Sequence, residues 1–379
     1  MSEPIDPSAL AKQNFSWKGH FAFGKTVTYT FLNGTKFPAY YYAQNNAGFK
    51  YFNPDTEKQE FYINPKSEME AFTQEQKALA KYLLYSDDPE QYSSTSSNFP
   101  TIEFRVSFSD VADFKFKFED TPLEDTSPNG QITLANAKLL PSQWAAVTSA
   151  PSGSYDTFAG DAFFDNDDIN SNSFNKLFNQ SPGSLAIGGY GYLLMLHELE
   201  HAMGIQNHAE AVYGQNSIYT SLKYTIMADA PRDDPHPDMN ASVFPMGLQL
   251  FDISAIQQLY GRNYSTRNDD TTYGLDQGFR DANTPFIYTI WDGGGLHDKI
   301  SGAGYSSGVQ IDLRQGHFSS IGARESVPVG PVRPVAFDPS GHSIDRGNVA
   351  IAYHTVIEDA VGSSHNDILI GNAWNQGYH

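Results

Sequence analysis

The residues that could do chemistry gather in LHELEHAMGIQNHAE, which runs from Leu196 to Glu210. His197 and His201 stand four positions apart, so on a helix their imidazoles lie on one face and can reach the same metal ion. Glu198 stands beside the first histidine, where it could take a proton from a water and return it to a leaving amine. This His-Glu-x-x-His pattern predicts a catalytic zinc site, although the five residues alone also occur by chance on amphipathic helices.

The third zinc ligand is the open question in this segment. Catalytic zinc takes three protein ligands and keeps one position open. Gly204 would let the chain turn out of the helix, because glycine adopts a left-handed conformation at little cost. The longer form of the zinc signature places its third histidine where Asn207 stands, and His208 comes one residue later. Either His208 binds after an enlarged turn, or Asn207 binds through its amide oxygen, or the site is degenerate; imidazole is the better zinc ligand, which favours His208.

The histidines are expected on a helix at 188–203. Two further helices and several strands are expected to position it. FTQEQKALAKYLLYS (72–86) has a capping box at Thr73 and Gln76, and FDISAIQQLYG (251–261) has Asp252 as a candidate cap. Alternating apolar residues or β-rich composition predict strands at four places, namely 27–31, 102–108, 114–118 and 131–139.

The character of the chain changes after Gly261. Gly, Asp, Asn and Ser become frequent, and short strand patterns such as VQIDL (309–313) and VAIAYHTVIE (349–358) stand between turns. We therefore expect three regions, listed in chain order: residues 1–65, a segment that is part of the catalytic domain or a propeptide; residues 66–261, the domain with the histidines; and residues 262–379, a β-rich domain.

Composition excludes several classes of protein. The 379 residues carry a formal net charge of −20, and nucleic acid is not an expected partner because binding it needs clustered Lys and Arg. The chain has no cysteine, which excludes disulfides and Cys-based zinc sites. No apolar run is long enough to span a membrane, and the N-terminal residues lack the apolar core of a signal peptide.

Several ordered motifs resemble those of one family. YTIMADA (224–230) resembles the Met-turn of metzincin proteases, with Met227 as its methionine, and FDISAIQQLYG resembles the joining helix of the serralysins within that clan. YTIWDGGGLHDKIS (288–301) and HTVIEDAVGSSHNDILIGN (354–372) resemble the serralysin Trp-Asp-x-Gly-Gly turn and the entry into its glycine-rich calcium-binding (RTX) repeats. The resemblance is strong from about residue 185 to 372.

The resemblance implies an α+β metzincin catalytic domain, with a twisted mixed sheet and a long active-site helix, followed by a small all-β domain that begins a parallel β-roll. It implies a secreted, extracellular zinc endopeptidase without an N-terminal signal peptide, with a peptide or protein as substrate and a proteinaceous inhibitor as a further partner. Zinc would be held by His197, His201 and His208, with Glu198 as general base and Met227 beneath the ion. Structural calcium would be held by backbone or hydroxyl oxygens of Arg267, Asp269, Thr271 and Gly294 and by the carboxylates of Asp292, Asp298 and Glu358.

Three departures from the family pattern support a rival hypothesis. Asn207 stands at the position of the third histidine, Asp229 replaces a tyrosine that follows the Met-turn, and Glu200 replaces a small residue between the ligands. The loss of the tyrosine removes a donor to the developing oxyanion. The alternative is therefore a catalytically impaired metzincin scaffold that acts as a secreted binding protein. A calcium-binding structural module is a third possibility, but it leaves Glu198 without a role.

Overall fold

The computed structural model describes much of the chain, in the following ranges: 5–11, 26–31, 50–53, 58–61, 69–84, 106–118, 131–137, 146–148, 160–165, 185–214, 217, 219–228, 244–275, 277–279, 286–322 and 347–373. Most of the N-terminal segment expected at 1–65 lies outside these ranges. Asp229 also lies outside them.

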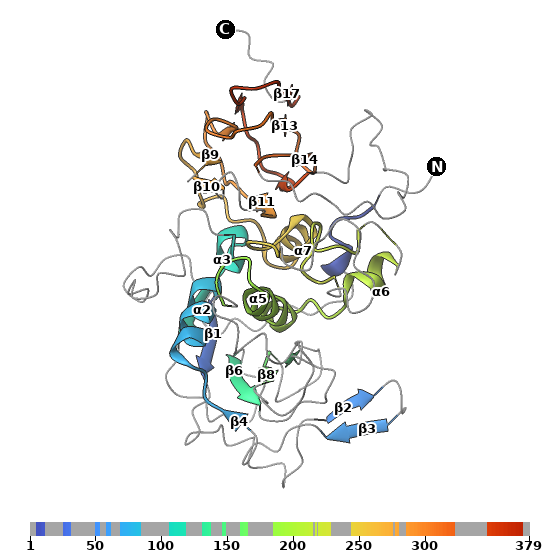
Figure 1. Ribbon diagram of the computed structural model, residues 1–379. Helices are drawn as coiled ribbons and strands as arrows, with labels where there is room; N and C mark the ends of the chain where they lie inside the picture. Colours follow the sequence, from blue (N-terminus) through green and yellow to red (C-terminus); the bar gives the residue numbers. More distant parts are fainter. Residues whose placement is uncertain are drawn as a thin grey trace.

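A six-stranded sheet underlies the segment with the histidines (Figure 1). Its strands follow the order β5-β1-β6-β8-β7, with the short β4 paired to β6. The first four run parallel, whereas β7 is antiparallel to β8 and ends the sheet. The bounds are β1 (Thr26–Phe31), β4 (Met69–Glu70), β5 (Lys115–Phe118), β6 (Gln131–Ala137), β7 (Ala146–Thr148) and β8 (Ala162–Asp165); a separate hairpin joins β2 (Lys50–Asn53) and β3 (Lys58–Phe61).

Alternation along the strands explains which face of the sheet is buried. Phe114 and Phe116 are buried, while the intervening Lys115 and Lys117 are exposed. Successive side chains of a strand point to opposite faces, so one face of β5 packs into the core and the other meets water. The strands expected at 27–31, 114–118 and 131–139 are confirmed.

The helices cover the sheet and join it to the rest of the molecule. They are α2 (Gln74–Leu84), α3 (Phe108–Val111), α5 (Tyr190–Ala202), α6 (Ala209–Tyr213) and α7 (Leu250–Tyr260), with a 3-10 turn η1 (Ala9–Ala11) near the N-terminus. α5 packs on β7 and β8, and Figure 1 shows it between the sheet and α7. The hydroxyl of Tyr260 donates to the carbonyl of Met203 over 2.6 Å, which ties the end of α7 to the end of α5.

The capping box expected in the helix at 72–86 is confirmed. The backbone N–H of Gln76 donates to the Thr73 hydroxyl over 3.2 Å, and the Gln76 side chain accepts from the Thr73 N–H over 2.8 Å. These reciprocal bonds pair two N–H groups that the helix itself cannot satisfy.

Two local expectations were wrong. The strand expected at 102–108 is not formed at its end, because α3 begins at Phe108 and a capping box between Ser107 and Asp110 starts a helical turn there. The cap of α7 is Gln249 and not Asp252; Asp252 is the third helical residue, whose carboxylate accepts from the Gln249 N–H over 2.8 Å. In both cases the acid lies three residues after the cap, which is the capping-box arrangement.

The C-terminal part consists of small, mostly parallel sheets. Its strands are β9 (Thr272–Leu275), β10 (Gly278–Phe279), β11 (Tyr288–Ile290), β12 (Lys299–Ser301), β13 (Gln310–Asp312), β14 (Phe318–Ser319), β15 (Val349–Ile351), β16 (Asp359–Val361) and β17 (Ile368–Ile370). The pairs β9·β12, β12·β16, β11·β15 and β13·β17 are parallel, and β14·β15 is antiparallel. The mixed α/β structure with small parallel sheets is compatible with the expected fold class; the detailed metzincin and β-roll layout and the domain bounds stay predictions.

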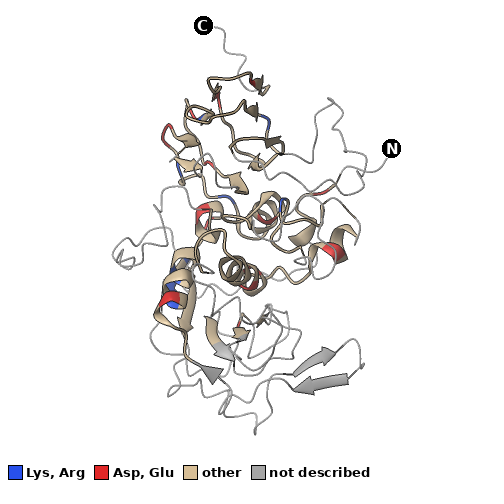
Figure 2. Ribbon diagram, viewed as in Figure 1, with Lys and Arg blue, Asp and Glu red and all other residues tan. Residues whose placement is uncertain are grey.

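In the view of Figure 2, the Lys and Arg residues of the described ranges are spread over several elements among Asp and Glu residues. None of the helices in the described ranges has the length and apolar character that crossing a membrane would require.

Candidate metal centre

Helix α5 brings two of the three histidines together. His197 and His201 lie one turn apart near its C-terminal end, with their ring centroids 4.8 Å apart. The helix stops because Gly204 takes a φ of 105°, a value that residues with a side chain rarely adopt. The Gly204 N–H donates to the carbonyl of His201 over 2.9 Å, and the chain then turns back toward the histidines.

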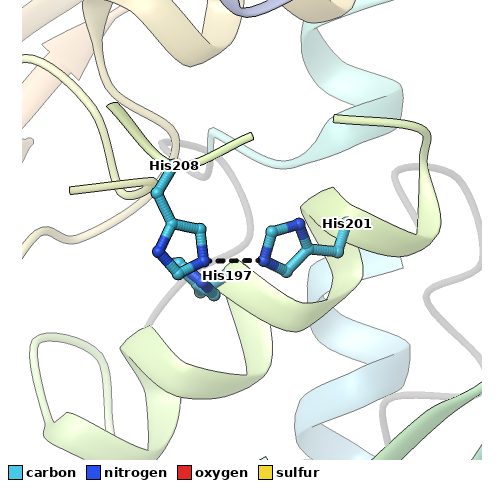
Figure 3. A group of neighbouring side chains, drawn as sticks. All are labelled: His197, His201 and His208. Carbon is cyan, nitrogen blue, oxygen red and sulfur yellow. Dashed lines mark hydrogen bonds between the residues drawn. The ribbon is translucent and has the colours of Figure 1, made fainter. Parts of the chain in front are cut away.

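His208 joins them from the start of α6, as the residue that caps it (Figure 3). One ligand atom from each of His197, His201 and His208 can be chosen so that all lie within 4.8 Å of one another. Among the described residues this is the only group of three or more His, Cys, Asp or Glu side chains that meets this criterion. Asn207 is half-buried in the turn before His208.

The spacing of two of these nitrogens suits zinc. Nε2 of His201 and Nε2 of His208 lie 3.2 Å apart. Two nitrogens bound tetrahedrally to one zinc ion at its usual bond length lie about 3.3–3.4 Å apart. The residues present therefore fit a zinc ion without rearrangement of this pair.

Hydrogen bonds from the backbone set the tautomers of the two helix histidines. Nδ1 of His197 lies 2.7 Å from the carbonyl oxygen of Ile226, and Nδ1 of His201 lies 2.6 Å from that of Ile205. A carbonyl can only accept, so each Nδ1 carries the proton and each Nε2 keeps its lone pair. This is the form of imidazole that binds a metal, with its other nitrogen held by an outer partner.

Electrostatics also favour the neutral form. Burial lowers the pKa of His201 well below its usual range, and the neighbouring His197 and His208 lower it further. The neutral ring is the ligand form, so the group is ready to bind a cation at neutral pH.

Glu198 follows His197 on α5 and is 5% exposed. The Thr148 hydroxyl, at the end of β7, donates to Oε2 of Glu198 over 2.7 Å. Burial raises the pKa of Glu198 to about 7, while the Thr148 bond and the nearby His208 lower it. A carboxyl group with a pKa near neutrality can both accept and return a proton.

Glu200, one of the departures noted in the sequence, lies on α5 directly before His201. It is fully buried, and neither of its carboxyl oxygens has a hydrogen-bond partner among the described residues. Burial raises its pKa well above the usual range, and the negative charge of the buried Asp252 raises it further. Burial therefore favours the neutral form of Glu200.

The expected Met-turn lies against the histidines. Met227 is fully buried in the core, and its carbonyl accepts from the N–H of Ala209, the residue after His208, over 2.8 Å. Its neighbour Ile226 supplies the carbonyl that holds His197. Asp229, the expected departure after this turn, lies outside the described residues.

The residues expected to hold calcium lie in the loop before β9, in the loop between β11 and β12, and at Glu358 directly before β16. Arg267 and Gly294 have φ values of 49° and 138°, and the Thr271 hydroxyl donates to the Asp269 carbonyl over 3.0 Å. The carboxylates of Asp292, Asp298 and Glu358 do not come as close together as the three histidines do.

Asp298 nevertheless shows the signs of a cation ligand. Its Oδ2 is buried without a hydrogen-bond partner among the described residues, while Oδ1 accepts from the Thr271 N–H over 2.7 Å. Burial raises its pKa to about 7, and the negative charges of Asp292, Glu358 and Asp270 raise it further. A buried carboxylate oxygen without a donor fits a hard cation such as calcium.

Two functional residues were missed by sequence reasoning. Thr148 lies fifty positions before Glu198 and has no motif around it, so only the packing of β7 against α5 shows it. Asp252 was seen only as a helix cap, although its carboxylate also accepts from the N–H of Ile226 over 2.9 Å. The second contact joins residues that are 26 positions apart, which local patterns do not report.

Comparisons with known proteins relate the chain to serralysin metalloproteases. A family profile described as "Peptidase M10 serralysin C terminal" matches residues 262–331. "Serralysin" from Photorhabdus sp. is 31% identical over 207 residues, which cover 50% of this chain and 38% of that protein. "Serralysin C" from Dickeya chrysanthemi is 31% identical over 213 residues (52% and 39%), and "Metalloprotease AprA" from Pseudomonas entomophila is 30% identical over 215 residues (52% and 39%). The chain thus spans less than half the length of these relatives.

Proposed function

We propose that this chain, which is related to the serralysin metalloproteases, is a secreted zinc-dependent endopeptidase that acts on peptide or protein substrates. The observation that carries the proposal is the convergence of His197, His201 and His208 beside the buried Glu198. The three histidines would hold zinc, and Asn207 would not. A zinc ion held there would supply a Lewis acid for a scissile carbonyl and would lower the pKa of a nearby water.

Glu198 would be the proton carrier of the reaction. Its Oε2 is oriented by the Thr148 hydroxyl, which leaves the other carboxyl oxygen to accept a proton from the attacking water. Because its pKa is near neutrality, the same group can then donate that proton to the leaving amine. Thr148 therefore orients Glu198 and keeps part of it ionised at neutral pH.

Strand β7 offers a place for the substrate. It ends the sheet, pairs only with β8 among the described strands, and carries Thr148 next to Glu198. An unpaired strand edge binds an extended peptide through backbone hydrogen bonds. A peptide added to this edge would pass Glu198 with its scissile bond near the three histidines.

Calcium would be a structural cofactor. Asp298 would bind it through its buried oxygen, with Asp292 and Glu358 and the oxygens of Arg267, Asp269, Thr271 and Gly294 as the remaining ligands. The ion would relieve the repulsion among the carboxylates.

Zinc content tests the ligand set. The wild-type protein, His208→Ala and the matched Asn207→Ala are purified side by side, and zinc per mole is measured by elemental mass spectrometry. We expect near-stoichiometric zinc in the wild type and in Asn207→Ala, and loss of zinc in His208→Ala. Retention in His208→Ala with loss in Asn207→Ala would assign the third position to Asn207 instead.

Hydrolysis tests the role of Glu198. Glu198→Gln should keep its zinc and lose about 10²–10⁴-fold in kcat, because the amide cannot carry the proton. A wild-type protein that holds zinc but cleaves no peptide would favour the alternative, a catalytically impaired scaffold. Hydrolysis that survived in Glu198→Gln would show that the proton carrier is another group.

A further inference from the structure

The backbone of segment 224–228 contacts one proposed zinc ligand, His197, and the residue that follows another, His208. The carbonyl of Ile226 accepts from Nδ1–H of His197 over 2.7 Å. The next carbonyl, of Met227, accepts from the N–H of Ala209 over 2.8 Å, directly after His208. The position of this segment therefore fixes the orientation of the His197 ring and anchors the backbone directly after His208.

Asp252, on α7, holds that segment from the opposite side. Its Oδ2 accepts from the N–H of Ile226 over 2.9 Å, and its Oδ1 accepts from the hydroxyl of Thr225. The Thr225 oxygen in turn accepts from the N–H of Met227 over 3.0 Å. All of these groups are fully buried, so water cannot replace the carboxylate.

The contacts form a continuous path from α7 to a ligand. The Asp252 carboxylate accepts from the N–H of Ile226, and Nδ1–H of His197 donates to the carbonyl of the same residue. A second backbone bond, from the N–H of Phe251 to the carbonyl of Tyr224 over 2.9 Å, fixes the start of the segment to the same helix.

We propose that Asp252 is a positioning residue for the metal centre: by holding Thr225 and Ile226 in place, it aims the Ile226 carbonyl at Nδ1 of His197 and so leaves Nε2 of that ring for the ion. The inference rests on the proposed function for the identity of the metal. The hydrogen bond of His197 that it explains involves Nδ1 and not the ligand atom Nε2, so it can be tested separately from zinc binding.

The competing explanation is that Asp252 only caps α7. The chain holds a matched capping acid in Asp110, which is also a buried third residue of a capping box and whose charge also acts on Arg267. Asp110 accepts from the N–H of Ser107 over 2.9 Å and from the Ser107 hydroxyl, so these bonds join it to its own cap and not to segment 224–228. Truncation of Asp110 therefore measures what the loss of a buried capping acid does when that acid does not hold segment 224–228.

The experiment compares Asp252→Ala with Asp110→Ala in the full chain. Imidazole N–H resonances of the metal-free proteins are recorded by NMR after labelling of histidine with nitrogen-15. Zinc affinity is measured by competition with a chromophoric chelator, with zinc alone as the probe. His201 is an internal control, because its Nδ1–H donates to Ile205 and not to the segment that Asp252 holds.

We expect Asp252→Ala to lose or shift the Nδ1–H resonance of His197 while that of His201 stays, and to weaken zinc binding by about 10–100-fold, the usual effect of removing an outer partner. Asp110→Ala should keep both resonances and the wild-type zinc affinity. Equal effects of the two variants, or an unchanged His197 resonance in Asp252→Ala, would overturn the inference.

A second variant serves if Asp252→Ala does not fold. Thr225→Val removes one of the two bonds that join Asp252 to the segment, together with the acceptor of the Met227 N–H, but leaves the bond from Asp252 to the cap of α7. It should shift the His197 resonance and weaken zinc binding in the same direction, and an unchanged resonance and affinity would overturn the inference. If wild-type protein binds no zinc, the proposed function fails, whereas wild-type binding with no difference between Asp252→Ala and Asp110→Ala is a failure of this inference alone.

Discussion

Replacement of Glu200 by leucine should stabilise the metal-free protein, although the residue lies between two proposed zinc ligands. Glu200 is fully buried on α5, and neither carboxyl oxygen finds a partner among the described residues. A buried polar group without a hydrogen bond costs about 1–3 kcal/mol, even when it is neutral. Leucine has a similar volume, favours helices and brings no polar atom. The free energy of unfolding should therefore rise by about 1–3 kcal/mol.

The gain should grow with pH. Burial and the charge of Asp252 raise the pKa of Glu200 well above its ordinary value of 4.5. Below that ordinary value, folded and unfolded chains both carry the proton, and only the cost of the neutral group remains. As the pH rises, the unfolded chain releases the proton and the folded chain keeps it, so the wild type loses stability until the pH passes the folded pKa. Each unit between the two pKa values is worth about 1.4 kcal/mol.

Urea denaturation of the metal-free proteins at pH 4.5 and pH 7.5 measures this effect. Glu75→Leu is the matched control, because it removes the same charge from an exposed position in the first turn of α2 and should leave the free energy of unfolding nearly unchanged at both pH values. A loss of stability in Glu200→Leu at pH 7.5, or a gain that does not grow with pH, would refute the reasoning and show that Glu200 has a stabilising partner in solution.

Three further predictions concern the candidate metal centre and the loops expected to bind calcium. Thr148→Val removes the hydrogen bond that lowers the pKa of Glu198, so the acid limb of the kcat/KM profile should move to higher pH; an unmoved limb would mean that another group sets it. Gly204→Ala forces a side chain onto a φ of 105°, so we expect the free energy of unfolding to fall by about 1–3 kcal/mol and the zinc content to fall as well. Full zinc content in this variant would show that the turn at Gly204 is not needed to bring His208 to the ion. Calcium should raise Tm more at pH 8 than at pH 5.5, because Asp298, with a pKa raised to about 7, is protonated and neutral at the lower pH; equal shifts in calorimetry would exclude Asp298 as a ligand.

Much of the fold and the site could be predicted from local patterns. The resemblance to serralysins is confirmed by the family profile and by the named relatives. The capping box of α2 and the alternation in β5 were also predicted correctly, because both depend only on neighbours in the chain. The strand expected at 102–108 was wrong at its end because the alternation of apolar residues continues into a capping box, and periodicity alone does not weigh the two.

The sequence by itself determined which reactive groups are present, namely two imidazoles one helical turn apart, an adjacent carboxylate and a glycine that ends the helix. These follow from the fixed geometry of a helix and the freedom of glycine. The tertiary structure alone decided that His208 meets the other two histidines, because its position depends on the bond from Ala209 to Met227. It also decided that Thr148 reaches Glu198 and that Glu200 is buried without a partner. Each of these depends on contacts between segments far apart in the chain, and no local spacing encodes the packing that brings them together.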